Sequence, residues 1–432
     1  MSLPEIPSAG PPLGTVLPFV GLLVAIAVLP LVAPHWWDRN RNKALVSAAF
    51  GLPVGIWVAT QDITIMGQAA LEYAAFLCLL GSLYVISGGI RVRGSLAGTP
   101  LSNTALLALG ALLANVVGTT GASMLLLRPY LRANRARKTR VHQVVFFIFI
   151  VANVGGCLTP LGDPPLFLGF LKGVPFTWTL RLWIPWLATV GALLGLFNLI
   201  DQVRFNREEL ETPRELMEDV QPREPVGLEG KRNLLLLAGV VGVVLVGGVW
   251  VHPRWGETAA QAFQAVAMAG LAALSLAVTP AGLRAANGFT WHPLVEVSVL
   301  FAGIFAAMIP ALAVLRARGP SLGVSAPWEF FWATGMLSAF LDNAPTYLSF
   351  LSMAQYLPDE VAGTTHAALA AISCGAVFFG AATYIGNGPN FMVRAIAEED
   401  GVRMPSFGGY LLWSLVVLVP ILLVVTLFCF HG

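Results

Sequence analysis

The stretch ANVGGCLTPLGDPPLFLGFLK runs from Ala152 to Lys172, inside an apolar run that begins near Val141. The run is long enough to cross a bilayer, but glycine, threonine and proline interrupt its centre, and Pro164 and Pro165 are adjacent. Adjacent prolines remove backbone donors and clash with the preceding turn, while glycine tolerates the irregular backbone that results. The stretch therefore predicts a helix that is broken at membrane depth.

A break of this kind restricts where the segment can lie. Each unpaired backbone group in hydrocarbon costs several kcal/mol, so the break persists only where it faces protein or a water-filled cavity. This break also contains a carboxylate, Asp163. We therefore expect it to line a binding site.

The composition is that of an all-α integral membrane protein, whose main partner is the lipid bilayer. Hydrophobic residues make up 56% of the 432 and charged residues 11%, and the mean hydropathy is +0.75. Nothing in the sequence suggests nucleic acid. The four cysteines are widely spaced in apolar segments, so they indicate neither a metal site nor a disulfide framework.

With about 20 apolar residues per crossing, the sequence predicts ten spans, two of them broken. These are residues 15–33, 44–60, 69–90, 141–171 (broken), 179–200, 233–252, 259–283, 292–315, 363–397 (broken) and 408–430.

Two further apolar stretches, 103–130 and 326–356, are interrupted near their middles by VVGTTGAS and LDNAPT, and each is predicted as a re-entrant helical hairpin. The positive-inside rule favours this interpretation. With both hairpins returning to the side that they entered from and both termini outside, only five of the 25 Lys and Arg residues lie outside. We expect a multi-pass protein of the cell (inner) membrane with a cytoplasmic linker at 201–232.

The linker separates two related halves, 1–200 and 233–432. A shift of 224 residues superimposes five identities, which pair Gly156, Thr159, Gly162, Pro165 and Phe167 with Gly380, Thr383, Gly386, Pro389 and Phe391. Each half has five transmembrane helices plus one hairpin, and an odd number of crossings inverts the second half relative to the first. Inverted repeats with discontinuous helices are typical of secondary transporters, with the site near mid-membrane.

Two acids lie where these elements should meet. Asp163 is in the first break, and Asp342 is at the tip of the second hairpin. A carboxylate at mid-membrane is costly unless it binds a cation, pairs or takes up a proton. No Lys or Arg lies in either break or tip, so we predict that Asp163 and Asp342 couple protons or cations, with helix capping as the alternative.

Around the acids lie hard oxygen donors and small residues, the predicted ion or substrate ligands Thr119, Thr120, Ser123, Asn153, Thr159, Gly162, Asn343, Thr346, Thr383, Asn387 and Asn390. Such donors suit Na⁺, for which Asp163, Asp342 and Asn343 are the candidate ligands. The N-termini of the half-helices could instead hold a substrate carboxylate. Glu72 and Glu296 occupy equivalent positions just inside their spans, and either interfacial solvation or a coupling role explains them.

The strings NVGGCLTPLGDPP (153–165), SAFLDNAPT (338–346) and YIGNGPN (384–390) resemble the paired signatures of the ion transporter superfamily, over nearly the whole chain. Within it, the chain is similar to the group of citrate transporters and NhaD-like sodium:proton antiporters. The resemblance implies a homodimer with an elevator-like mobile domain. The Ser-Asn-Thr triplets of dicarboxylate symporters correspond here to Gly118-Thr119-Thr120 and Asp342-Asn343-Ala344, and neither is intact.

The sequence thus predicts a secondary Na⁺/H⁺ antiporter, with Na⁺ or H⁺ as coupling ion and no other cofactor. The alternatives are a Na⁺- or H⁺-coupled citrate or dicarboxylate transporter, and a passive channel. We expect no enzyme and no catalytic residues, because no nucleophile-and-base pair or nucleotide-binding loop is present.

Overall fold

The computed structural model describes residues 11–93, 97–211 and 227–431. Within these ranges the fold is almost entirely helical, as the composition predicts. Two strands of three residues each, β1 (Arg91–Arg93) and β2 (Gly227–Glu229), pair in antiparallel fashion. The class of an all-α integral membrane protein is confirmed, because nine helical stretches of the described residues are long and apolar enough to cross a membrane.

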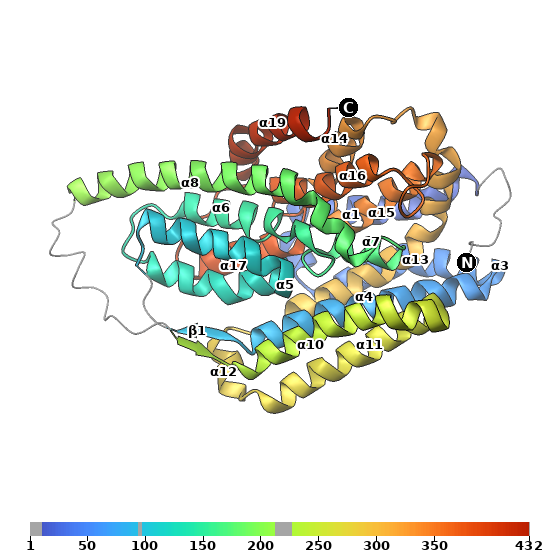
Figure 1. Cartoon of the computed structure of the whole chain (residues 1–432), viewed down its shortest axis with the longest axis horizontal. Coiled ribbons are helices and arrows are strands. Elements are labelled where there is room, and N and C mark those ends of the chain that lie inside the picture. Colours follow the sequence, from blue (N-terminus) through green and yellow to red (C-terminus); the bar gives the residue numbers. More distant parts are fainter. Residues whose placement is uncertain (1–10, 94–96, 212–226, 432) are drawn as a thin grey trace.

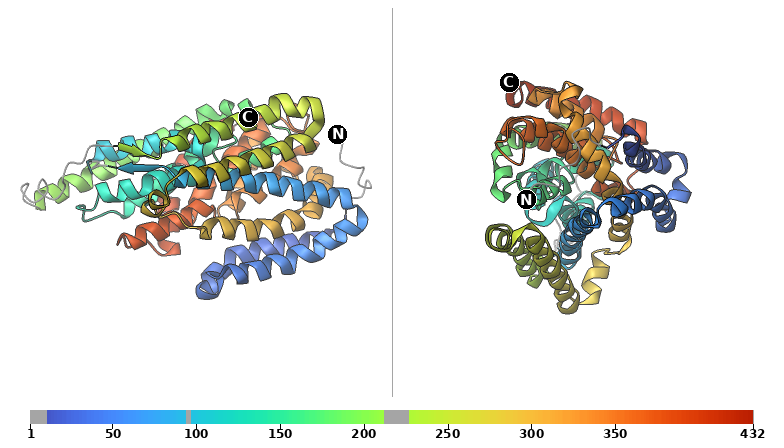
Figure 2. Two further views of the ribbon diagram at one scale, coloured as in Figure 1. Left: turned by 90° about the horizontal axis from the view of Figure 1, so that it is seen from below. Right: turned by 90° about the vertical axis from the view of Figure 1, so that its right-hand side faces the viewer.

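Most of the long helices run along the longest axis of the molecule, as Figures 1 and 2 show from three sides. The helices outside the hairpins and breaks are α1 (Leu17–Val32), α3 (Asn40–Gln61), α4 (Ile63–Gly88), α8 (Trp183–Glu211), α10 (Arg232–Val246), α11 (His252–Val278), α13 (His292–Arg318), α18 (Phe407–Trp413) and α19 (Val419–Cys429), with the short α2 (Pro34–Trp37) and α12 (Ala281–Ala286). Short 3₁₀ or π segments connect several of them, at Leu13–Val16, Phe176–Leu182, Gly247–Val251, Gly319–Leu322, Ala354–Tyr356 and Ser414–Leu418.

Helix α5 (Pro100–Ala133) is a helical hairpin whose two arms meet at Gly118. Gly118 has φ 77° and ψ 157°, a conformation that side-chain-bearing residues rarely adopt. The two ends of α5 lie side by side, because Asn103 and Asn134 exchange side-chain hydrogen bonds, both of 2.9 Å. The chain therefore doubles back, and Gly118 and Thr119 form the tip of this first hairpin.

Helices α14 (Pro327–Ser338) and α15 (Asn343–Met353) form a second hairpin. Its outer ends are tied together by the Tyr356 hydroxyl, which donates to the carbonyl oxygen of Val324. Residues 339–342 make the turn, and Asp342 is the N-cap of α15.

Two discontinuous helices complete this part of the fold. The first consists of α6 (Val141–Ile150), the 3₁₀ turn η2 (Val154–Leu158) and α7 (Pro164–Leu171). The second consists of α16 (His366–Phe379), η7 (Gly380–Ala382) and α17 (Gly388–Glu399). In both, the backbone between the 3₁₀ turn and the last helix is extended or irregular, so its polar groups need partners from other elements.

Helices α3, α4, α10, α11 and α13 pack against one another and are called the framework helices below. The carboxyl end of α4 is anchored within them by Arg284 and Asn287. The Arg284 guanidinium donates to the carbonyl oxygen of Val85 and, at 2.8 Å, to that of Ser275, while Asn287 Nδ2 donates to the Ile90 carbonyl at 2.9 Å. Donors at a helix carboxyl end satisfy carbonyls that have no partner within the helix.

A buried polar network ties the base of the first hairpin to α8. Asp201, which is fully buried, accepts from Arg137 at 2.8 Å and from Asn103 at 2.9 Å, and lies 2.8 Å from His142 Nε2. Of the predicted linker 201–232, residues 201–211 therefore continue α8, 227–229 form β2, and 232 begins α10. Residues 212–226 lie outside the described residues.

Candidate functional site

Asp163 is the N-cap of α7, where Pro164 and Pro165 begin the helix without backbone donors of their own. Its carboxylate is buried, with 1% of the residue exposed. Three neutral side chains donate to it: Thr119 Oγ1 at 3.0 Å and Asn387 Nδ2 at 3.3 Å reach Oδ1, and Asn343 Nδ2 reaches Oδ2 at 2.5 Å. Both hairpin tips and both breaks therefore meet at one carboxylate.

Asp163, Thr119, Asn343 and Asn387 are called the Asp163 cluster below. Hydrogen bonds between asparagine side chains extend this cluster across the two breaks. Asn387 Nδ2 also donates to Asn153 Oδ1 at 3.0 Å, and Asn153 Nδ2 donates to Asn390 Oδ1 at 2.6 Å. Asn390 in turn donates to the carbonyl oxygens of Gly380 and Thr383 at 2.7 and 2.8 Å. The extended backbone of the second break is thus hydrogen-bonded through side chains that also contact the first break.

Asp342 lies next to this cluster without a direct bond to Asp163. Its Oδ1 accepts from the backbone amide of Ala344 at 3.0 Å, which is the capping geometry that the sequence offered as the alternative. The residue is only partly buried, and it directly precedes Asn343, which donates to Asp163. The neighbouring Asn343 has a buried Oδ1 without a hydrogen-bond partner among the described residues, so one oxygen donor of the cluster is free.

The two halves make the same bond between hairpin and break. Thr159 Oγ1 donates to the carbonyl oxygen of Asn115 at 2.5 Å, and Thr383 Oγ1 donates to that of Ala339. Donors and acceptors are each separated by 224 residues. The caps of the last half-helices also match, with φ −143° and ψ 144° at Asp163 and φ −152° and ψ 139° at Asn387.

The remaining predicted ligands lie near the cluster but do not all face Asp163. The Gly162 carbonyl accepts from the Thr119 amide at 2.8 Å, which holds the first tip against the first break. The Thr346 hydroxyl donates to the Asp342 carbonyl one turn earlier in α15. Ser123 is buried with its Oγ unbonded in the described structure, and Thr120 is partly exposed.

Sequence reasoning missed Asn115, which lies near the end of the first arm of α5. Its Nδ2 donates to the Gly155 carbonyl at 2.7 Å, and its Oδ1 accepts from the Leu158 amide at 2.8 Å. Asn115 thereby pairs the backbone of η2, so it positions the break that carries Asp163. The sequence contained one signal for this role, the polar Asn115 side chain inside an otherwise apolar run.

The structure also shows what Glu72 and Glu296 contact. Glu72 is buried and accepts both of its hydrogen bonds from Lys172 Nζ, at 2.7 and 2.8 Å. Glu296 lies 2.6 Å from Lys43 Nζ. Interfacial solvation is therefore the wrong interpretation for Glu72, because its own side chain is buried and its carboxylate is paired with Lys172.

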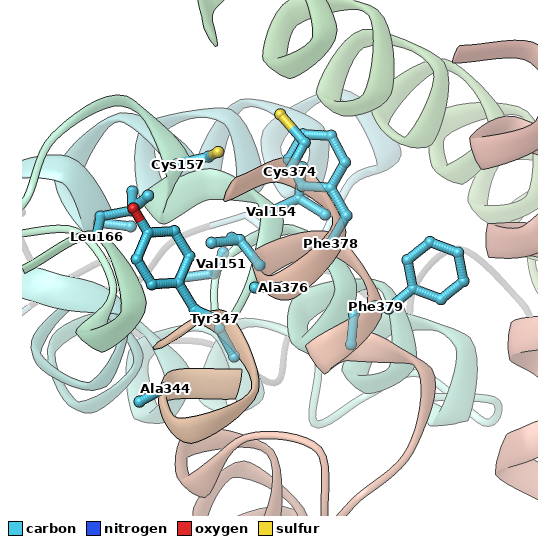
Figure 3. Close-up of a cluster of buried hydrophobic side chains, with 14 of the residues drawn as sticks. Val151, Val154, Cys157, Leu166, Ala344, Tyr347, Cys374, Ala376, Phe378 and Phe379 are labelled. Carbon is cyan, nitrogen blue, oxygen red and sulfur yellow. The ribbon is translucent and has the colours of Figure 1, made fainter. Parts of the chain in front are cut away.

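Buried apolar side chains of the first broken helix, α15 and α16 pack against one another. Figure 3 shows Tyr347 of α15 beside Val151 and Leu166 of the first broken helix, with Ala376 of α16 nearby. The contact is close, since a methyl group added at Gly169 would lie 2.2 Å from the Tyr347 hydroxyl. The first broken helix and the second hairpin, which belong to different halves, therefore share one packed apolar core.

A separate apolar groove of about 590 Å³ lies between α1, α13 and the second hairpin. Leu341 and Thr346, on either side of the tip residues of that hairpin, form part of its wall. The Asp163 cluster is not part of its lining. Among the described residues, no group of three or more His, Cys, Asp or Glu is placed to hold a metal ion.

Discontinuous helices that bring a buried carboxylate and neutral oxygen donors to the centre of a membrane bundle define the class of membrane transporters. A family model described as "putative citrate transport" matches residues 9–430. The chain belongs to this family, so it is a transporter rather than an enzyme. A search of curated proteins returned no match.

Proposed function

We propose that the chain is a cation-coupled secondary transporter of citrate-like carboxylates, and that Asp163 is the group that binds the coupling cation or proton. One observation carries the proposal: a buried carboxylate receives three neutral donors, from both hairpin tips and the second break. A carboxylate in this position is stable when it is protonated or holds a cation. The substrate class comes from the family match.

The charges at the site give a reason for coupling. Asp163 and Asp342 contribute two carboxylates, and no Lys or Arg donates to either of them in the described structure. An approaching anion is repelled by an uncompensated carboxylate in a medium of low dielectric constant. A bound cation removes this repulsion, so cation and anion should each raise the affinity for the other.

We further propose that residues 1–200 and 233–432 are inverted repeats that move in an elevator-like manner. The equivalent Thr159–Asn115 and Thr383–Ala339 hydrogen bonds support the repeat. In each half, this bond joins a hairpin to a break, so that hairpin and break would move together. We propose that each hairpin enters and leaves the membrane on the same side, and that the protein is a homodimer. We place it in the inner membrane, with both termini outside and the linker in the cytoplasm.

A second candidate is Na⁺/H⁺ antiport. The unbonded Asn343 Oδ1 beside Asp163 favours it, because amide and carboxylate oxygens together suit a small hard cation. In this mechanism Asp163 would alternate between a proton and Na⁺, and Asp342 and Asn343 would contribute further ligands. No organic anion would then be required.

Proteoliposomes containing the full chain distinguish the candidates. Uptake of labelled citrate that requires an inward H⁺ or Na⁺ gradient, and that is lost in Asp163→Asn, supports the first. Dissipation of a preset pH gradient by Na⁺ without citrate supports the second. If both signals are flat for the native chain, or equal in native chain and Asp163→Asn, the proposed role of Asp163 is wrong.

A further inference from the structure

An ion pair joins the end of the first broken helix to the framework. Lys172 is the C-cap of α7, and its Nζ lies 2.7 and 2.8 Å from the two carboxylate oxygens of Glu72 on α4. Only 5% of the Glu72 side chain is exposed, against 32% of the Lys172 side chain. The contact is therefore buried on the framework side and reaches solvent on the α7 side.

The same short helix carries the candidate coupling group at its other end. Asp163 is the N-cap of α7, and the eight residues of the helix span about 12 Å at 1.5 Å per residue. The helix is packed tightly against α15, where the Tyr347 hydroxyl rests on Gly169. A displacement of Asp163 is thus transmitted to Lys172, because a two-turn helix moves as a rigid piece.

We propose that the Glu72–Lys172 ion pair is a gating contact. It holds α7 against the framework helices in this conformation, and it opens when the Asp163 cluster changes from being accessible on one side of the membrane to being accessible on the other. The inference rests on the proposed transport function. Glu72 and Lys172 are positioning residues, since neither touches Asp163 or the cluster around it.

The unequal burial of the partners explains how the contact can open. Removing Lys172 leaves a buried carboxylate unpaired, which is unfavourable, so the closed state is stabilised. Lys172 itself can turn toward solvent, and its charge also interacts favourably with the carboxyl end of α7. A cation bound at Asp163 that shifts α7 would supply the free energy for opening.

The repeat-equivalent carboxylate offers a matched control. Glu296 of α13 pairs with Lys43 of α3 at 2.6 Å, with 4% of the Lys43 side chain exposed. Both partners belong to framework helices that pack against each other. This second ion pair does not connect to a broken helix, so it should stay closed throughout transport.

Cysteine cross-linking tests the proposal. Cys78, Cys157, Cys374 and Cys429 are first replaced by alanine in the full chain, and then either Glu72→Cys with Lys172→Cys or Lys43→Cys with Glu296→Cys is introduced. A short bis-methanethiosulfonate reagent closes each pair in proteoliposomes, because each cysteine thiol displaces a sulfinate and forms a disulfide that a reductant can cleave. We expect the 72–172 cross-link to lower the initial transport rate by about tenfold or more, which corresponds to about 1.4 kcal/mol, and a reductant to restore the rate. The 43–296 cross-link should leave the rate unchanged.

A readout that needs no transported substrate separates this proposal from the proposed function. The rate of 72–172 cross-linking is measured with and without Na⁺, citrate and a pH shift, with the 43–296 pair as reference. A ligand-dependent rate at 72–172 alone supports gating even if neither citrate nor Na⁺/H⁺ transport is detected. Ligand-independent cross-linking at both pairs, or full transport by the cross-linked 72–172 protein, overturns it.

The charge exchange Glu72→Lys with Lys172→Glu tests the ion pair without a covalent bond. We expect Glu72→Gln alone to change the transport rate, and the exchanged pair to return it toward the native value. Size-exclusion profiles and melting curves identify variants that fail to fold. A folded Glu72→Gln variant that transports at the native rate would contradict gating.

Discussion

Asn343 Nδ2 donates to Asp163 Oδ2 at 2.5 Å, across a sequence separation of 180 residues. The bond joins the tip of the second hairpin to the first broken helix. The candidate site therefore exists only when the two halves of the chain are folded against each other.

Asp163→Asn should abolish cation-coupled transport but leave the fold intact. The amide has nearly the same shape and can still accept from Thr119, and Asn343 can turn its unbonded Oδ1 toward the new donor. An amide, however, neither ionises nor neutralises a cation. Transport assays in proteoliposomes check the activity, and melting curves check the fold. Asp163→Ala is the control, which should also lower the melting temperature because it leaves three donors unpaired.

Asn343→Ala should weaken the contact between the halves. It removes a buried donor to a charged acceptor, which costs about 1.5–3 kcal/mol. We expect a lower melting temperature and a lower apparent affinity for the coupling cation. Ser349→Ala is a matched control in the same helix, since the Ser349 hydroxyl bonds only to the Pro345 carbonyl of α15. Equal melting temperatures for the two variants would contradict the bridging role of Asn343.

Gly162→Ala should destabilise the first break. An added methyl group would lie 2.0 Å from the Gly156 carbonyl oxygen, and overpacking of this kind typically costs about 1–3 kcal/mol, occasionally more. Gly388→Ala is the control at the start of α17, where no atom lies within 4 Å of the added group apart from its chain neighbours and its own helix backbone. Thermal unfolding in detergent compares the melting temperatures of the two variants, and we expect the lower value for Gly162→Ala. Equal melting temperatures would mean that the first break can accommodate the added methyl group.

Asp201→Asn should destabilise the chain without direct effect on the Asp163 cluster. The buried Arg137 guanidinium would lose one of its two carboxylate partners, and breaking a buried ion pair costs about 3–5 kcal/mol. Glu398→Gln is the control, because the Glu398 side chain is 43% exposed and pairs with Arg394 one turn away on α17. We expect a large fall in melting temperature for Asp201→Asn and a small one for Glu398→Gln.

Much of the architecture could be predicted from local patterns in the sequence. The apolar runs predict the membrane helices, because about 20 apolar residues are needed to cross hydrocarbon wherever they lie in the chain. Gly118 and the Pro164–Pro165 pair mark places where the backbone departs from the helix. Proline and glycine alter the backbone conformation at their own position and in the adjacent turn, so this effect can be predicted from local sequence. Asp163 was identifiable for the same reason, as a carboxylate inside such a departure.

Partners distant in sequence could not be predicted in this way. The Glu72–Lys172 ion pair depends on how α7 packs against α4, and the role of Asn115 depends on where η2 passes the first hairpin. Asp201 lies in the predicted cytoplasmic linker 201–232, yet the continuation of α8 buries it against Arg137.

The sequence by itself determined that the chain crosses a membrane repeatedly, where its helices break, and which acids lie in those breaks. Only the tertiary structure decided that Asp163 receives Asn343, Asn387 and Thr119 together, that Asp342 caps its own helix, and which basic residue pairs with each glutamate. The physical reason is that hydrophobicity and backbone conformation act over a few residues, whereas hydrogen bonds and ion pairs depend on which elements the fold brings together.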